Sequence, residues 1–362
     1  MIARSTKLAA LLVFVAAFTL YARTLAPTIT WAHNGTDGGD LITAAATWGV
    51  PHPPGYPTYV TLGYLFSKIP IGSVAYRLNL MSAIFTAVAA ALTTLTICRI
   101  TSTWAPRFAR EGIGILAGLT FAASPMTWGQ ATIAEVHGLN AVCVALISFL
   151  IAPIVFRGEK TSSRQLAFIT FLWGLAAGNL LTIAAFAPLM IVAWRRTIFI
   201  PQPASLFLKV RSAALPIIAF LHGLSVYLLI PLRAIAQPPI NWGNAVTLDN
   251  FWRQVSAQLY RGYVFAVPPS EYPQRLIAFG QLIVAQFGWI GVLLGAIGVL
   301  RGLNSPNKSW RWLTLPIALY AIFAFTYNTI DADLYLIPIW MFSAWAIARG
   351  ALSIQDWLTQ HT

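Results

Sequence analysis

Long runs of apolar residues alternate with short polar segments along the whole chain. Many runs approach the length of about 20 residues that an α-helix needs to cross a bilayer. The segments 112–127 and 166–179 are short for a full membrane span. Membrane proteins tolerate such short or broken helices where the backbone lines a cavity. We therefore predict an all-α integral membrane protein with about ten transmembrane helices, at 8–25, 75–98, 112–127, 137–156, 166–179, 180–194, 213–232, 276–300, 313–327 and 335–349.

The first long polar connection, 26–74, contains two apolar stretches that are too short to span a bilayer, 40–50 and 56–69. They are joined by Pro51-His52-Pro53-Pro54-Gly55-Tyr56-Pro57, whose prolines fix backbone dihedral angles and end helices. The pattern predicts two helices lying in the membrane interface. Their aromatic residues suit that depth: Trp48, Tyr56, Tyr59, Tyr64 and Phe66.

The second long connection, 233–275, is rich in Trp, Tyr and Arg. No polar stretch is long enough for a separate soluble domain, so we predict one polytopic membrane domain, 1–362. The composition agrees, because 58% of the residues are hydrophobic and only 9% are charged, against about 25% charged in soluble domains. Cys98 and Cys143 fall inside apolar segments and are predicted to be unpaired thiols.

The net charge is +13. The basic residues are distributed in a way that sets the topology of the membrane helices, and this pattern does not indicate nucleic-acid binding. With the N-terminus inside, 16 of the 23 basic residues fall in cytoplasmic segments. We therefore predict a multi-pass protein of the cytoplasmic (inner) membrane with its N-terminus inside. The first apolar run is long and lacks a small-residue cleavage site, which favours an uncleaved helix over a signal peptide. The outer segments hold most of the acids: Asp37, Asp40, Glu135, Asp249, Glu271, Asp331 and Asp333.

The strongest local signal for chemistry is Thr36-Asp37-Gly38-Gly39-Asp40, with two carboxylates three residues apart just outside the first helix. One interpretation is structural, since Asp37 can cap the next helix and Asp40 can favour its N-terminal dipole. The other is catalytic, with one carboxylate as general base and the second orienting a group or binding a divalent cation. Two carboxylates alone do not make a convincing metal site.

Other polar residues at the outer helix ends are candidate substrate-binding or phosphate-binding groups. Each also has a structural interpretation: a stiff turn around His52, interfacial solvation of Glu135, turn chemistry at Asn179, snorkelling of Arg233 and a solvated loop at Asp331. An arginine in this position can also grip a phosphate with its planar fork. The candidates are His52, Tyr56, Glu135, His137, Asn179, Arg233, Arg261, Asp331 and Asp333.

The order of these motifs resembles a known family. The specific part is the outer Asp-Gly-Gly-Asp at 37–40 followed by Gly49-Val50-Pro51-His52-Pro53-Pro54-Gly55-Tyr56-Pro57. Looser matches are Arg77-Leu78-Asn79-Leu80, 128–140, 174–179, Asn241-Trp242-Gly243 and Asp331-Ala332-Asp333. Together they resemble the bacterial relatives of transmembrane protein 260, in the protein O-mannosyltransferase-like branch of the GT-C glycosyltransferases.

This resemblance implies a GT-C-like bundle that uses a polyprenyl-phosphate sugar as donor, with mannose as one candidate sugar. It places the family's acidic motif on Asp37 and Asp40, where the family usually has Glu at the second position. The family also usually has Tyr where His137 stands, and His where Leu180 follows Asn179. The implied reaction is an inverting displacement on the extracytoplasmic side, with Asp37 as base and Arg233 and Arg261 holding the leaving phosphate.

Two other function classes stay open at this level: a membrane transporter or lipid flippase, and a non-catalytic scaffold of the cell envelope. A transporter is expected to place ionisable residues near the bilayer midplane and often shows inverted repeats, whereas the acids here are interfacial. No Walker motif or dinucleotide fingerprint is present, so no soluble nucleotide cofactor is indicated. The acceptor is left open between protein, lipid and glycan.

Overall fold

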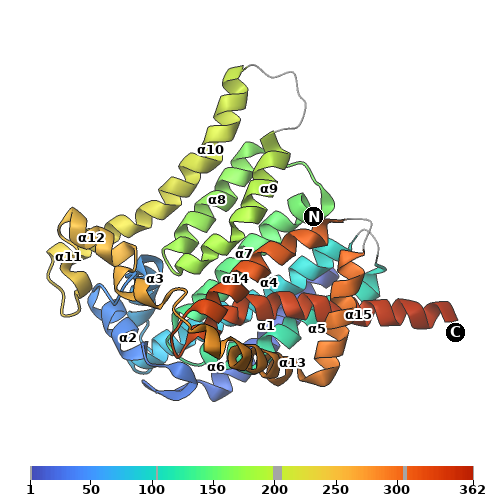
Figure 1. The fold of residues 1–362 in the computed structure, drawn as a ribbon, viewed down its shortest axis with the longest axis horizontal. Helices are drawn as coiled ribbons and strands as arrows, with labels where there is room; N and C mark the ends of the chain where they lie inside the picture. Colours follow the sequence, from blue (N-terminus) through green and yellow to red (C-terminus); the bar gives the residue numbers. More distant parts are fainter. Residues whose placement is uncertain (1, 103–104, 199–205, 305–307, 362) are drawn as a thin grey trace.

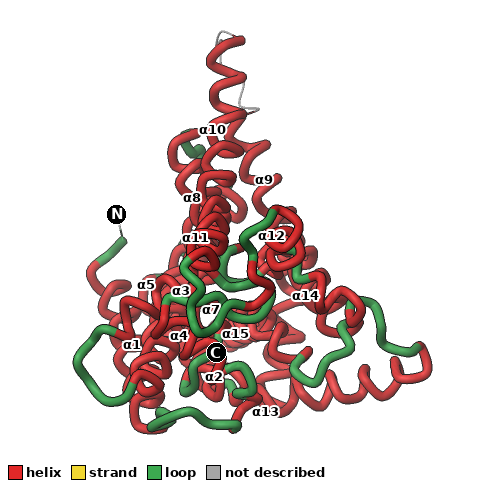
Figure 2. The backbone as a smooth tube through the Cα atoms, turned by 90° about the vertical axis from the view of Figure 1, so that its left-hand side faces the viewer, coloured by secondary structure: helices red, strands yellow, loops and turns green. Residues whose placement is uncertain are grey.

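The computed structural model describes residues 2–102, 105–198, 206–304 and 308–361, and nearly all of this part is helical. No β-strand occurs among these residues, as Figure 2 shows. The longer helices are α1 (Arg4–Thr24), α4 (Val74–Thr101), α5 (Arg107–Ala123), α7 (Val136–Arg157), α8 (Ser163–Ala177), α9 (Ala187–Ile198), α10 (Leu206–Leu224), α13 (Tyr272–Leu303), α14 (Thr314–Thr326) and α15 (Ile337–His361).

Each of the ten predicted helices corresponds to a helix of the structure, so the all-α membrane fold is confirmed. Within the described ranges, six helical segments are long and apolar enough to cross a membrane: Arg4–Thr24, Val74–Thr101, Val136–Arg157, Val210–Ile235, Pro269–Leu303 and Ala332–Gln360. The helices α5, α8, α9 and α14 are shorter. The count of about ten spans therefore stays a prediction.

Short helices fill the connections. They are α2 (Gly38–Thr47), α3 (Pro57–Ser67), α6 (Pro125–Ala131), α11 (Leu229–Ile235) and α12 (Leu248–Val255). The 3-10 segments are η1 (Ala32–Asn34), η2 (Leu181–Phe186), η3 (Ser225–Leu228), η4 (Trp242–Asn244), η5 (Gln258–Tyr263), η6 (Pro269–Glu271), η7 (Lys308–Leu313) and η8 (Ala332–Leu336). Two predicted helices are thus composite: 180–194 begins as η2, and 213–232 is divided into α10, η3 and α11.

The core lies between α1, α4, α5, α7 and α15, while α8, α9 and α10 form a group that projects from it (Figures 1 and 2). The helix α1 is part of this core. Its buried residues Val13, Ala17 and Tyr21 face α4 and α5, and the Tyr21 hydroxyl donates to the Ala122 carbonyl oxygen at 2.8 Å. Cys98 and Cys143 are both unpaired, as predicted.

Small residues let neighbouring helices approach closely. A Cβ added to Gly174 of α8 would lie 2.3 Å from the Phe220 carbonyl oxygen of α10. A Cβ on Gly298 of α13 would lie 1.8 Å from the Ala346 carbonyl oxygen of α15. Such contacts are the usual basis of helix association in membranes, where apolar burial drives little.

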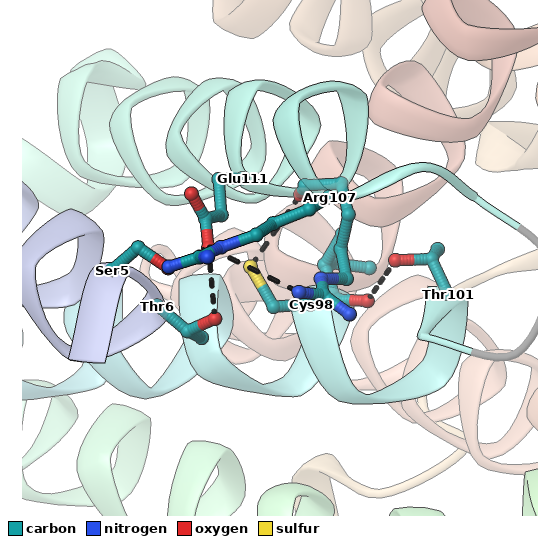
Figure 3. A network of polar contacts seen from close by, with 8 residues as sticks. Ser5, Thr6, Cys98, Thr101, Arg107 and Glu111 are labelled. Atoms are coloured by element: carbon teal, nitrogen blue, oxygen red, sulfur yellow. Dashed lines mark hydrogen bonds and ion pairs between the residues drawn. The ribbon is translucent and has the colours of Figure 1, made fainter. Parts of the chain in front are cut away.

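A polar network ties the start of α1 to the start of α5 (Figure 3). Glu111 accepts hydrogen bonds from the hydroxyls of Ser5 and Thr6, the latter at 3.2 Å. Arg107 lies 3.5 Å from the same carboxylate oxygen and also donates to Ser5. The network compensates the Glu111 charge at a helix end and fixes the position of α1.

The two short helices predicted in the first loop are present as α2 and α3, but they do more than lie at an interface. Leu41 of α2 and Tyr59 of α3 pack against Leu78 and Met81 of α4. Tyr59 is fully buried and Tyr56 is 7% exposed, so both rings contact the protein interior, and their interfacial depth stays a prediction. These rings face the protein because α3 packs on the bundle.

The second loop is docked on the first. The Val50 N–H donates to the Ile240 carbonyl oxygen at 2.9 Å, and the Trp242 N–H donates to the Val50 carbonyl oxygen at 3.0 Å. The Gln254 side chain of α12 donates to the Pro51 carbonyl oxygen at 2.8 Å. The rigid turn around His52 is therefore covered from a segment about 200 residues away in sequence.

Candidate active site

A cavity of about 800 Å³ opens between the two loops, η2, α14 and η8. The loops contribute polar groups that include Asp37, His52 and Arg261, and Asp331 is added from the connection between α14 and η8. The segments η2 and α14 contribute an apolar wall of Leu180, Leu181, Ala184, Ala185, Leu319 and Phe323. A site with convergent polar groups and a large apolar wall is suited to an amphipathic ligand.

Asp40 holds His52 in place from the first turn of α2. The Nδ1 atom of His52 lies 2.7 Å from Asp40 Oδ2, and the His52 backbone N–H donates to the same oxygen at 3.0 Å. The Trp242 indole N–H donates to Asp40 Oδ1 at 3.0 Å. Both carboxylate oxygens are thus engaged. An ionised carboxylate only accepts, so His52 donates its Nδ1 proton and presents Nε2 to the cavity side.

Asp37 lies on the other side of the imidazole and lines the cavity. Its Oδ2 is 3.4 Å from His52 Nε2, and the Tyr56 hydroxyl is 3.1 Å from the same nitrogen. The ring of His52 is enclosed by aromatic rings, with centroids at 5.1 Å for Tyr56 and 6.1 Å for Tyr260. The arrangement Asp40–His52–Asp37 leaves one carboxylate, Asp37, facing the ligand space.

The two carboxyl groups of this arrangement have opposite electrostatic environments. Burial is the largest influence on Asp37 and raises its pKa, assisted by the nearby Asp331 and Asp40 and opposed by His52. Burial also acts to raise the pKa of Asp40, but its hydrogen bonds from His52 and Trp242 outweigh this and lower the pKa. Pairs of titratable groups whose pKa values are shifted in opposite directions are typical of acid–base sites.

Five of the predicted site residues besides Asp40 lie outside the cavity wall, so their predicted direct contact with substrate is not supported by the geometry: Glu135, His137, Asn179, Arg233 and Asp333. Four of them are buried, Glu135, His137, Asn179 and Arg233. The predicted residues that do line the cavity are Asp37, His52, Tyr56, Arg261 and Asp331.

Three of the predicted residues that do not line the cavity lie close to residues that do. The backbone N–H groups of Val136 and Asp37 hydrogen-bond the Glu135 carboxyl group, whose pKa is raised by burial and then by Asp37. The His137 ring packs edge-on against Tyr335, with centroids 5.8 Å apart. The Asn179 side chain donates to the Val136 carbonyl oxygen at 3.1 Å. Glu135 therefore positions the Asp37 backbone.

Arg233 is buried under α2 and α3, with 1% of its surface exposed. Its Nη2 donates to Thr61 Oγ1 at 2.6 Å, and its guanidinium lies over the Trp48 ring, 4.2 Å from the centroid. Arg233 is not among the residues that line the cavity. Arg261 of η5 lines the cavity and is exposed there.

Sequence reasoning missed much of the aromatic wall. Tyr263, Tyr327 and Tyr335 line the cavity beside the predicted Tyr56. Tyr335 is edge-on to Tyr327, with centroids 5.7 Å apart. Tyr260 also lines the cavity, and burial raises its pKa to about 12, so its hydroxyl stays protonated and can donate. The only available signal was the density of Tyr around Arg261 and the acidic pair at 331 and 333.

The residues present do not form a typical cation site. Among the described residues, no group of three or more His, Cys, Asp or Glu side chains gathers in a metal-binding arrangement. Asp40 has both oxygens engaged by His52 and Trp242.

The comparisons with known proteins point to one group. The family described as "Protein O-mannosyl-transferase TMEM260 N-terminal domain" matches residues 37–199, which begin at the cavity carboxylate Asp37. A protein of Mus musculus named "Protein O-mannosyl-transferase TMEM260" is 35% identical over 324 residues, which is 85% of this chain. The chain is a relative of the TMEM260 proteins.

A second TMEM260 relative, from Dictyostelium discoideum and named "Protein O-mannosyl-transferase tmem260", is 28% identical over 358 residues, or 93% of this chain. The chain spans 41% of the length of this relative and 44% of the mouse TMEM260 protein. The matches thus cover nearly all of the membrane part described above, including both outer loops that form the cavity.

Proposed function

We propose that this protein is a glycosyltransferase that moves a sugar from a polyprenyl-phosphate-linked donor to an acceptor hydroxyl on the extracytoplasmic side of the membrane. The supporting observation is the cavity, which combines the cradled carboxylate Asp37, the cation Arg261 and an apolar wall from η2 and α14. Both relatives are named as protein O-mannosyl-transferases, which makes mannose the first sugar to test and a protein the first acceptor.

The reaction is a direct displacement at the anomeric carbon. The acceptor oxygen bonds to that carbon while the bond from the carbon to the phosphate oxygen breaks, and its electron pair leaves with polyprenyl phosphate. Asp37 takes the proton of the acceptor hydroxyl. A general base of this kind contributes roughly 10²–10⁴-fold to the rate. One displacement inverts the configuration at the anomeric carbon.

The neighbouring residues have distinct roles in this step. Asp40 fixes the orientation and tautomer of His52, as a carboxylate does for a catalytic imidazole. His52 Nε2 lies 3.4 Å from Asp37 Oδ2, so it is placed to receive the proton that Asp37 takes up. Arg261 offers positive charge to the leaving phosphate, which stabilises the transition state. The walls of η2 and α14 suit the first isoprene units.

The side of the membrane follows from the charge pattern within this proposal. The charged residues of the cavity come from the segments 26–74 and 233–275 and from 327–335, which are outside if the N-terminus is inside. The positive-inside rule supports that orientation, because 16 of the 23 basic residues then lie on the cytoplasmic side. The placement in the inner membrane belongs to the same proposal.

The test is transfer by the purified chain in lipid nanodiscs. The donor is a radiolabelled polyprenyl-phosphate mannose, and the acceptors are Ser- and Thr-containing peptides, with lipid and glycan acceptors in parallel. We expect label on an acceptor with the wild type and with Asp249→Asn, a control that removes an exposed outer-loop acid away from the cavity wall. Folded protein that neither transfers nor hydrolyses the donor contradicts the proposal.

A further inference from the structure

The helix α12 in the second loop exposes two apolar residues and buries a polar one. Its polar residue Gln254 is buried, with 1% exposed, and donates to the Pro51 carbonyl oxygen at 2.8 Å. Its apolar residues Leu248 and Trp252 are 82% and 61% exposed. These two residues are four positions apart, so they form one outward strip.

A second outward strip of α12 is charged. Asp249 and Arg253 are also four positions apart, are exposed, and form an ion pair of 2.8 Å between Arg253 Nε and Asp249 Oδ2. The angle between successive residues of an α-helix is about 100°, so the charged strip lies beside the apolar one. A helix with adjacent apolar and charged strips on its outer side is suited to lying in a membrane interface, with one strip toward the acyl chains and the other toward water.

The helix α12 packs against the end of a candidate membrane span. Phe251 and Val255 of α12 pack against the cluster that contains Ile230 and Ala234 of α11, and Figure 1 shows α11 and α12 side by side. The segment Val210–Ile235 is one of the candidate spans. Its exposed apolar residues near α12 are Leu228, Leu232 and Ile235, each more than half exposed.

We propose that α12 is an interfacial helix of the second loop, with Leu248 and Trp252 inserted at the boundary between lipid headgroups and acyl chains. The occupant of this face is bilayer lipid, because α12 packs against α11 at the end of the candidate span Val210–Ile235. Tryptophan is favoured at this depth, since its ring is apolar and its N–H is polar. This proposal concerns the membrane contact and is independent of the transfer reaction.

The contact has a consequence for the cavity. The chain from α12 runs directly into η5, which places Tyr260 and Arg261 in the cavity wall. Gln254 joins the same segment to the turn that carries His52. Lipid contact at α12 therefore stabilises one wall of the cavity from outside. Isolated short helices are only marginally stable in water. The packing of α12 on the protein and its lipid contact therefore supply the stability that it lacks by itself.

The test uses spin labels in the full chain reconstituted in phosphatidylcholine and phosphatidylglycerol vesicles. Cys98 and Cys143 are replaced by Ser, and a single label is attached at Leu248→Cys or, as the matched control, at Asp249→Cys. We expect the label at 248 to be severalfold more accessible to oxygen than to a water-soluble nickel chelate, and the label at 249 to show the reverse order. Equal access of the chelate to both labels overturns the proposal, and so does protection of 248 only when another protein is added.

A second measurement avoids cysteine substitution. In the chain labelled with 5-fluorotryptophan, the resonance of Trp252 is assigned as the one that Trp252→Phe removes. We expect this resonance to be broadened by a doxyl-labelled lipid and spared by a water-soluble gadolinium chelate. The exposed Trp31 of the first loop, assigned in the same way, reports whether the lipid probe has reached the outer interface. Broadening of Trp252 by the chelate alone sinks the assignment.

Discussion

His52 Nδ1 lies 2.7 Å from Asp40 Oδ2, and the His52 backbone N–H donates to that same oxygen at 3.0 Å. This double contact joins the first turn of α2 to the proline-rich turn that follows it. It fixes the imidazole so that Nε2 points to Asp37. The two carboxylates of the Asp-Gly-Gly-Asp motif thus have different roles: Asp40 is a positioning residue, and Asp37 faces the substrate space.

Replacing Asp37 by Asn should abolish transfer and leave the fold intact. The change removes the proton acceptor but keeps the size of the side chain, and loss of a general base costs roughly 10²–10⁴-fold in rate. Transfer from a polyprenyl-phosphate sugar is measured together with thermal unfolding in nanodiscs. Asp249→Asn is the matched control. Turnover of Asp37→Asn at the wild-type rate would rule out this base.

The pH dependence of kcat/KM should report the environment of Asp37. A general base acts in its ionised form, so activity falls as the pH drops through the pKa of Asp37, which burial and neighbouring carboxylates raise. Asp331→Asn removes one of those negative charges, which lowers the pKa of Asp37 and shifts the acid limb to lower pH. Initial rates across the acid range measure this. An active Asp331→Asn enzyme with an unmoved acid limb contradicts the assignment.

Asp40→Asn should reduce kcat more than it raises KM. Hydrogen bonds to charged groups contribute about 1.5–3 kcal/mol, so misorientation of His52 should cost roughly 10–100-fold. Asp40→Glu, which restores the carboxylate, should recover part of the activity. If Asp40→Glu is no more active than Asp40→Asn, the role of Asp40 is steric.

The same variant should have a pH-dependent stability defect. The folded-state pKa of Asp40 is lowered, so its ionised form contributes stability that is present above its unfolded pKa. That contribution is lost as the pH falls through the lowered pKa. The difference in Tm between wild type and Asp40→Asn should therefore be largest near neutral pH and shrink in acid. A constant difference across the acid range is evidence against this linkage.

Replacing Arg261 and replacing Arg233 should have different effects on donor binding. Arg261→Gln removes the cation of the cavity and should raise KM for the donor with little change in Tm. Arg233→Met replaces a buried guanidinium that lies over Trp48, outside the cavity wall, with an apolar side chain. Its donor KM should stay at the wild-type value. The reverse pattern supports Arg233 as the phosphate-binding group.

Close helix packing predicts a strong dependence on Gly298. Gly298→Ala places a Cβ 1.8 Å from the Ala346 carbonyl oxygen, so α13 and α15 must separate. Overpacking costs about 1–3 kcal/mol and occasionally more. Gly280→Ala in the same helix meets no atom within 4 Å and is the control. Thermal unfolding should show a lower Tm for Gly298→Ala only; equal Tm values contradict the packing.

The lengths of apolar runs were sufficient to predict the helices. The ten predicted segments and the two short helices around the proline-rich turn all correspond to helices, because each is defined by local periodicity and local breakers. The composite helices were harder to predict from the sequence. The chain from α10 to α11 reads as one apolar run, yet its backbone changes type at η3. Hydrophobicity does not distinguish α from 3-10 geometry.

By itself, the sequence determined the helical membrane fold and the candidate pair Asp37 and His52, since both are set by local composition and a short motif. Only the tertiary structure decided that Arg261 and Asp331 meet that pair, while Arg233 and Glu135 lie behind the wall. The physical reason is that helix rotation and packing decide which side of a residue faces the cavity. Polar residues at helix ends look alike in sequence whether they line a cavity or are buried behind it.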